Sequence, residues 1–280
     1  MDTLEVKRII LDRVPALEDI SANISWDKIA LKFNKRIEPS HKPKDDIITS
    51  SCFLDYIISS LGSDENAKAN LDTVNAIDSE ISKALEYCKA HQQFKGKIKD
   101  LVNKMLVDMD EDVFGTNSAF KNWINELFVF NALTGYNNYE LIDIERPFNA
   151  QRTDERVKTC DFVCKDKENE EIWFEVVTFQ GINPAKQENS VTMCDFIKQK
   201  IACKYKEKTQ GLSQKGIPNL KIIPIIEYVD GLEKFDIMLN MDISIEPLSV
   251  MKNNIDGKVY VEIRPLDDYL SQIRVQAVKP

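Results

Sequence analysis

Histidines are scarce in this sequence, and its cysteines are not closely paired. Only His41 and His91 occur, and none of the six cysteines belongs to a C-x-x-C pair. Zinc sites and disulfide frameworks depend on such ligands at short, regular spacing, so the sequence indicates neither. Cys160 and Cys164 fall in one strand-like run, and we expect them to be small buried apolar side chains in a reducing compartment.

The sequence also lacks a long uninterrupted apolar run. A membrane-spanning helix needs about 18 or more such residues, and a signal peptide needs an apolar segment near the N-terminus, which charges interrupt here. We therefore expect a cytoplasmic protein that does not enter a membrane. With 280 residues, of which 43% are hydrophobic, the chain can build one large domain or two small ones with a proper core.

Positive charge is in the minority overall but is concentrated in one segment. The net charge of −9 argues against broad, non-specific binding of nucleic acid over the whole surface. The segment 198–221 nevertheless holds seven lysines and a single acid, Glu207. This local basic patch is either a contact surface for nucleic acid or a solvated helix face.

The hydrophobic pattern changes along the chain. Residues 1 to about 110 carry helical periods, whereas strand-like runs begin near residue 139, so we predict a helical domain over 1–112 and an α/β domain over 113–280. The helical domain would serve in targeting, regulation or dimerisation. Apolar residues from Val74 to Cys88 recur at spacings of three and four, which indicates a packing seam in an intramolecular bundle or in a homodimer.

The second domain is predicted to contain two helices and a mixed sheet. Its order is helix, three strands, helix, strand (α-β-β-β-α-β), and the expected ranges are 117–135, 139–145, 158–164, 171–179, about 189–210, and 220–229. On the first helix, Glu126 has apolar neighbours at helical spacing, so we expect this carboxylate to face the protein interior.

Glu175 stands in the middle of the buried strand pattern EIWFEVVTFQG, where an unpaired charge is unfavourable. The polar hexapeptide 165–170 predicts a hairpin turn, and if its centre lies near Glu168, paired residues have numbers that sum to about 336. Asp161 then lies opposite Glu175. The two carboxylates would repel each other unless Mg²⁺ or Mn²⁺ lies between them. The alternative is that Asp161 is in solvent and Glu175 pairs with a lysine.

These residues resemble the PD-(D/E)xK, or restriction-endonuclease-like, superfamily of metal-dependent nucleases over about residues 117–230. In that superfamily a helix with a Glu precedes a hairpin whose strands carry an Asp and then (Asp/Glu)-x-Lys. The resemblance implies a restriction-endonuclease-like core and an Mg²⁺- or Mn²⁺-dependent endonuclease, with Asp161, Glu175 and Glu126 as metal ligands and catalytic acids. Val177 stands where the superfamily has its lysine.

The resemblance includes families whose lysine has moved to the following helix. Lys200 and Lys204 share a face of that helix, so either could take the catalytic role here. The neighbouring side chains are expected to contact nucleic acid, with DNA preferred over RNA: Lys198, Tyr205, Lys206 and Lys208.

The absence of the lysine at Val177 also suggests a second function class, a catalytically inactive nuclease-fold module that binds nucleic acid or a protein partner. The presence of all three acids favours the enzyme, because an inactive site has no reason to keep buried carboxylates that repel one another.

Overall fold

The computed structural model divides into two compact units, Met1–Leu127 and Phe128–Pro280. The structure describes residues 1–37, 53–107, 119–135, 139–148, 158–182, 201–210, 212, 218–228, 236–240, 251–255, 258–262 and 264–265. The boundary between the units falls inside one helix, whereas the boundary expected after residue 112 lies outside the described residues.

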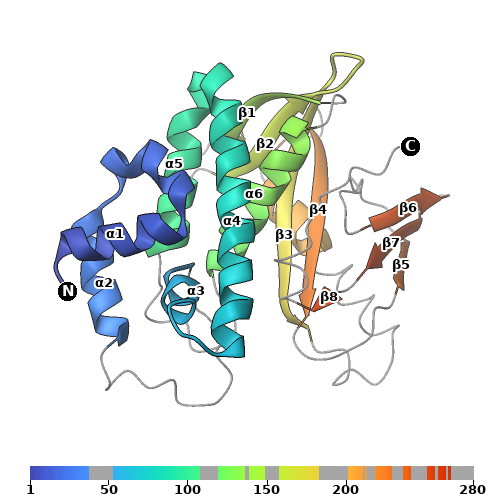
Figure 1. The fold of residues 1–280 in the computed structure, drawn as a ribbon. Helices are drawn as coiled ribbons and strands as arrows, with labels where there is room; N and C mark the ends of the chain where they lie inside the picture. The colour runs from blue at the N-terminus through green and yellow to red at the C-terminus, as the bar shows by residue number, and fades with distance from the viewer. Residues whose placement is uncertain are drawn as a thin grey trace. The chain divides into compact units, whose positions relative to one another are not determined.

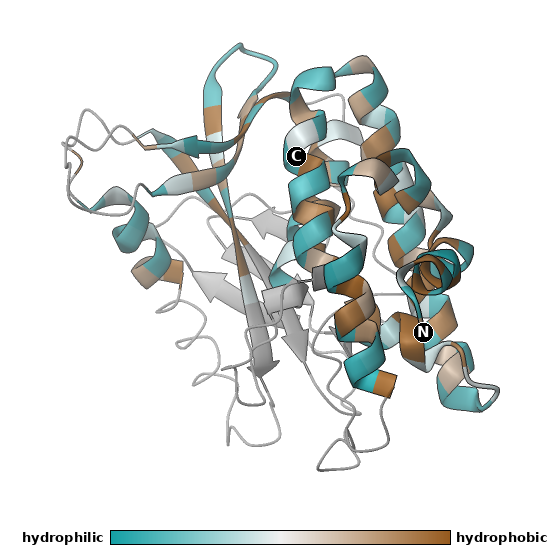
Figure 2. Ribbon diagram, turned by 90° about the vertical axis from the view of Figure 1, so that its left-hand side faces the viewer, coloured by the Kyte–Doolittle hydropathy of each residue, from teal (hydrophilic) through white to brown (hydrophobic). Residues whose placement is uncertain are grey.

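The described part of the first unit is helical (Figure 1). Its elements are α1 (Thr3–Arg13), η1 (Pro15–Asn23), α2 (Trp26–Ile37), α3 (Phe53–Ser59), α4 (Glu65–Ala90), η2 (Gln92–Phe94), α5 (Lys95–Val107) and the first half of α6 (Ala119–Gly135). Figure 2 shows hydrophilic and hydrophobic positions alternating along these helices, as amphipathic helices require. None of the described helices is long and apolar enough to cross a membrane.

A carboxylate caps the N-terminus of two of the described helices. The Asp2 side chain accepts a hydrogen bond from the Glu5 backbone N at the start of α1, and Asp64 accepts one from Ala67 N at the start of α4. Each thereby satisfies a backbone donor that has no partner within its helix. The predicted seam on α4, from Val74 to Cys88, is fully buried within the single chain, as an intramolecular bundle requires.

The second unit contains a mixed sheet of five strands in the order β1-β2-β3-β4-β8 (Figure 1). Its strands are β1 (Glu140–Pro147), β2 (Thr159–Lys165), β3 (Glu171–Ile182), β4 (Asn219–Tyr228) and β8 (Arg264–Pro265). β1, β2 and β3 are antiparallel neighbours, and β3 pairs with β4 in parallel. A second sheet contains β5 (Asp236–Asn240), β7 (Lys258–Glu262) and β6 (Met251–Ile255). The predicted mixed α/β class, preceded by a helical region, is confirmed.

The hairpin between β2 and β3 has the predicted register. Its pairs run from Phe162↔Phe174 to Lys165↔Glu171. Asp166 holds the turn, because its Oδ1 accepts hydrogen bonds from the backbone N of Glu168 and of Glu170, both at 2.9 Å. Asn169 adopts φ 68° in this turn, a left-handed conformation that asparagine tolerates better than most residues.

One face of the hairpin forms an aromatic core. Phe162 and Phe174 are fully buried, and Phe130 of α6 lies 6.4 Å from Phe162 between ring centroids. Tyr139 meets Phe174 edge-on at 5.4 Å. Because side chains alternate between the two faces of a strand, Asp161 and Glu175 lie on the opposite face from these phenylalanines. That face carries the candidate site.

Candidate functional site

Glu175 is the only carboxylate among the described residues of β3 that is almost completely buried, with 2% of its surface exposed. Ile222 is its partner on β4, and Val177 follows it on the same face of β3. A carboxylate in such surroundings is strongly disfavoured in its ionised form unless cations or hydrogen-bond donors reach it. Two lysines do so.

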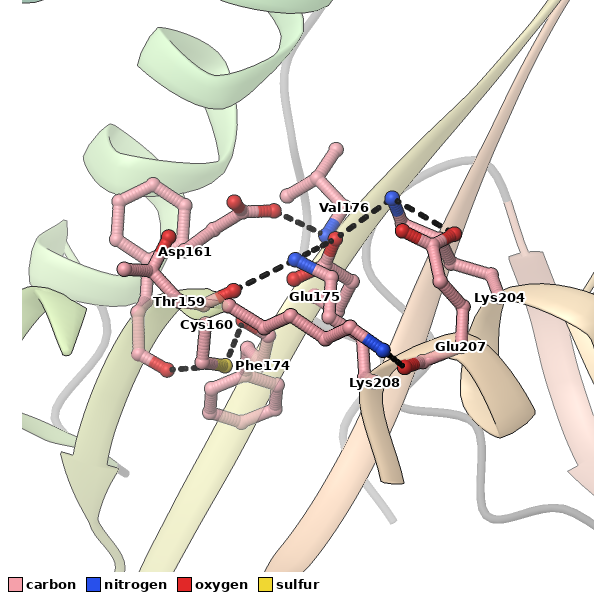
Figure 3. A network of polar contacts seen from close by, with 11 residues as sticks. Thr159, Cys160, Asp161, Phe174, Glu175, Val176, Lys204, Glu207 and Lys208 are labelled. Atoms are coloured by element: carbon pink, nitrogen blue, oxygen red, sulfur yellow. Dashed lines mark hydrogen bonds and ion pairs between the residues drawn. The ribbon is translucent and has the colours of Figure 1, made fainter. Parts of the chain in front are cut away.

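Both lysines belong to the helical residues 201–209, which precede β4 in the chain. Lys208 Nζ lies 2.8 Å from Glu175 Oε1, and Lys204 Nζ lies 3.4 Å from the same oxygen (Figure 3). The two lysines are four residues apart and therefore share one helix face. Ile201 of this helix is fully buried, and Lys158 Nζ donates to the Glu207 carbonyl at 2.6 Å, so both ends of the segment are anchored.

The two lysines differ in their surroundings. Lys208 has 10% of its side chain exposed and also donates to the Thr159 carbonyl on β2 at 2.6 Å. Lys204 has 29% exposed, and its second carboxylate, Glu207, is 3.7 Å away. Lys208 therefore joins the helix to Glu175 on β3 and to the backbone of β2. Lys204 approaches Glu175 from the side that is open to solvent.

Asp161 occupies the position on β2 that continues the hairpin register to Glu175, one step beyond the pair Phe162↔Phe174. It is half-buried, and its Oδ2 accepts a hydrogen bond of 2.7 Å from the Val176 backbone N (Figure 3). That bond fixes the carboxylate beside β3. The sequence prediction that the hairpin brings the two acids together therefore agrees with the register and with this hydrogen bond.

Burial dominates the protonation of this cluster. It raises the pKa of Glu175 to about 8, an effect that the charge of Asp161 increases and that Lys208 and Lys204 oppose. Burial likewise raises the pKa of Asp161, against Lys208 and the Val176 hydrogen bond. Burial disfavours the charge on Lys208, but the interactions with Glu175 and Asp161 outweigh it and raise the pKa of this lysine. The two carboxylic acids therefore retain their protons to higher pH than they would in water.

The second oxygen of Glu175, Oε2, is buried and has no hydrogen-bond partner among the residues that the structure describes. Such an atom carries a desolvation cost of about 1–3 kcal/mol or more that a bound ion or water would offset. Asp161 and Glu175 are the hard oxygen ligands that Mg²⁺ and Mn²⁺ prefer, and Mg²⁺ is often held by one or two carboxylates together with water and substrate phosphate. The residues thus fit such an ion, although the described part of the chain holds no group of three His, Cys, Asp or Glu side chains able to bind a metal by themselves.

Cys160 lies next to Asp161 but does not take part in such chemistry. Its Sγ donates to the Phe174 carbonyl at 2.7 Å, and burial raises the pKa of the thiol well above its ordinary value. A thiol that stays protonated is neither a nucleophile nor a metal ligand. Cys88 and Cys164 are buried as well, whereas Cys203, on the helix with the two lysines, is exposed.

The structure brings together three of the predicted catalytic residues, Asp161, Glu175 and Lys204. Lys200 lies outside the described residues, as does Lys198. Glu126 is half-buried on α6 and belongs to the first compact unit, whereas Asp161, Glu175 and Lys204 belong to the second. Val177 is buried, and the ammonium groups near Glu175 come from the helix instead of from this position of β3.

Lys208 is the residue whose place the sequence reasoning missed. It was expected to contact nucleic acid together with Tyr205 and Lys206, yet it is the lysine closest to Glu175. The spacing of four that joins Lys200 to Lys204 continues to Lys208, and this was the signal that could have identified it. Lys206 is exposed and Tyr205 half-buried on the same helix.

The two carboxylates and the two lysines are thus the residues from which a function can be inferred. Comparisons add no relative: no family model, no curated protein and no solved structure matches this chain.

Proposed function

We propose that this chain is a metal-dependent nuclease that hydrolyses phosphodiester bonds, with DNA as its preferred substrate. The observation that carries the proposal is Glu175, a buried carboxylate beside Asp161 whose Oε2 has no partner among the described residues, while Oε1 is held by a lysine. Two acids on a hairpin and lysines from the next helix are the groups that PD-(D/E)xK nucleases use. We extend the proposal to a restriction-endonuclease-like core over α6, β1–β3, the helix and β4.

Asp161 and Glu175 would hold Mg²⁺ or Mn²⁺. When bound, the ion would act as a Lewis acid at the scissile phosphate and lower the pKa of a water molecule. The protein's own groups would position the two carboxylates. The Val176 backbone N holds Asp161 in place, and Lys208 holds Glu175 Oε1, so Oε2 is the oxygen left to bind a cation.

Lys204 takes the role of the missing motif lysine in this proposal. Its ammonium group lies 3.4 Å from Glu175 Oε1 and is partly exposed, so a phosphate entering from solvent can reach it. There it would stabilise the negative charge that develops during hydrolysis. Lys206 and Tyr205 on the same helix would contact the flanking backbone and bases, and Lys198 and Lys200 would extend this surface.

A second candidate function is binding without catalysis, by a module that retains the nuclease fold. The favouring observation is the 2.8 Å contact between Lys208 and Glu175, because this ion pair can neutralise the acid without a metal. Val177, which stands where the superfamily has its lysine, also favours binding without catalysis. The unsatisfied Oε2 and the nearby Asp161 favour the enzyme, since a structural ion pair needs neither.

The two candidates are separated by a cleavage assay on labelled supercoiled and linear duplex DNA, single-stranded DNA and RNA, with Mg²⁺ or Mn²⁺. Asp161→Asn and Glu175→Gln remove charge at nearly constant shape. Glu171→Gln is a matched control, because Glu171 lies on the same strand but accepts its hydrogen bonds from Arg146 and Trp173. Metal-dependent cleavage that both site variants lose and the control keeps supports the nuclease. Retained binding without cleavage in all four proteins supports the inactive module.

A further inference from the structure

Three carboxylates occupy adjacent positions across three strands of the sheet. On β1, Ile144 pairs with Phe162 and Arg146 pairs with Cys160, so Glu145 between them stands opposite Asp161. The register of β2 with β3, continued one step beyond the pair Phe162↔Phe174, in turn places Asp161 opposite Glu175. Residues directly opposite each other in antiparallel strands are the closest cross-strand neighbours. Glu145, Asp161 and Glu175 therefore form one row across the sheet.

The charge of Glu145 reaches Asp161. It adds to the burial that raises the pKa of Asp161, whereas Lys208 and Lys204 lower that pKa. Glu145 is itself half-buried, so solvent screens the interaction incompletely. The row thus joins a third acid to the two whose buried oxygen, Oε2 of Glu175, has no hydrogen-bond partner among the described residues.

We infer that Glu145 is a third acid of the proposed cation site, adding negative charge that lets Asp161 and Glu175 hold a divalent cation in the presence of Lys204 and Lys208. The inference rests on the proposed nuclease function and assigns it a residue that neither the sequence pattern nor the resemblance indicates. Glu145 acts here as a positioning residue, through its charge on the row and not as a catalytic group.

The backbone at Glu145 has a conformation that glutamate rarely adopts. Its φ is 53°, in the left-handed region, where glycine and asparagine are far better tolerated than glutamate. Asparagine at this position would suit the backbone better and would remove the charge. Residues held in such conformations occur preferentially at functional sites.

The test measures Mn²⁺ affinity of the full chain by isothermal titration calorimetry. Glu145→Gln removes the charge, and Glu140→Gln is the matched control, an exposed acid on the same strand whose partner across the ladder is Lys165. We expect Glu145→Gln to weaken Mn²⁺ binding about tenfold, the scale on which groups around metal ligands act. Glu140→Gln should bind as the unmodified protein does.

Glu145→Asn provides a second readout that a structural role would not produce. Asparagine suits the left-handed backbone, so this variant should unfold about 2–4 °C higher than the unmodified protein in the absence of metal, while it binds Mn²⁺ about tenfold more weakly. Higher stability together with weaker binding is the combination expected of a residue retained for function.

The outcomes separate this inference from the proposed function. If Asp161→Asn abolishes Mn²⁺ binding but both Glu145 variants bind normally, Glu145 has no part in a site that nevertheless exists. If the unmodified protein neither binds Mn²⁺ nor cleaves any substrate, the nuclease proposal fails and the role of Glu145 fails with it. Weaker binding in both Glu145 variants, with the control unchanged, supports the inference.

Discussion

The strongest prediction concerns Glu175→Gln and the pH dependence of stability. In the native state burial raises the pKa of Glu175 from its ordinary value of 4.5 to about 8. Between these values the native protein keeps a proton at Glu175 that the unfolded chain has released. The free energy of unfolding must therefore fall as the pH rises across this interval, because stability falls wherever the native state binds more protons.

The size of the effect follows from the same two values. One proton of difference changes the free energy of unfolding by about 1.4 kcal/mol per pH unit, so the whole interval corresponds to about 5 kcal/mol. Glutamine cannot titrate, and Glu175→Gln should lose this slope. Asp161, whose pKa burial also raises, contributes a slope of the same sign in both proteins. The difference between the two proteins therefore reports Glu175 together with its interaction with Asp161.

The assay is urea unfolding from pH 5 to pH 9 without divalent cations, followed by tryptophan fluorescence, to which Trp173 on β3 contributes. Glu171→Gln is a control whose titration lies below the assayed pH range, so its pH profile should run parallel to that of the unmodified protein. Burial disfavours the Glu171 charge, but hydrogen bonds from Trp173 and Arg146 outweigh it and lower the pKa of this acid. The stability that Glu171 provides is present above its unfolded pKa and is lost as the pH falls. Parallel pH profiles for the unmodified protein and Glu175→Gln would refute the reasoning.

Three further predictions use urea unfolding or cleavage. Lys208→Met removes the buried donor to Glu175 and Thr159 and should lower the free energy of unfolding by about 3 kcal/mol. Lys204→Met should lower it by less than about 1 kcal/mol, since this lysine is partly exposed, yet reduce cleavage at least about a hundredfold; equal stability losses would contradict this division of roles. Phe174→Ala empties a fully buried aromatic position and should lower the free energy of unfolding, measured with urea, by about 4 kcal/mol. A decrease below about 1 kcal/mol would be inconsistent with that aromatic core.

Much of the α/β unit was predictable from the sequence, because its signals are local. The strand runs and the polar turn between them fixed the hairpin, and the sum of 336 holds for its observed pairs. Register is specified strongly here since one face must bury Phe162 and Phe174. The contact of Asp161 with β3 followed from that register.

The contributions of Lys208 and Glu145 depend on information that local patterns do not carry. Whether Lys204 or Lys208 lies closer to Glu175 depends on how the helix docks against β2 and β3, which is a tertiary property. The position of Glu145 depends on the pairing of β1 with β2, and the connection between these strands is too long to set the register as a hairpin turn does. Its left-handed backbone is likewise invisible in the sequence.

The exposed thiol of Cys203 makes the helix accessible to direct observation. Cys88, Cys160 and Cys164 are buried, and burial raises the pKa of each, so a thiol-reactive dye should distinguish Cys203 from them once Cys52 and Cys194, which lie outside the described residues, are replaced by serine. A fluorophore at this position would sit one residue before Lys204. Its emission could then report, in real time, whether the lysine-bearing segment shifts when a divalent cation or an oligonucleotide is added.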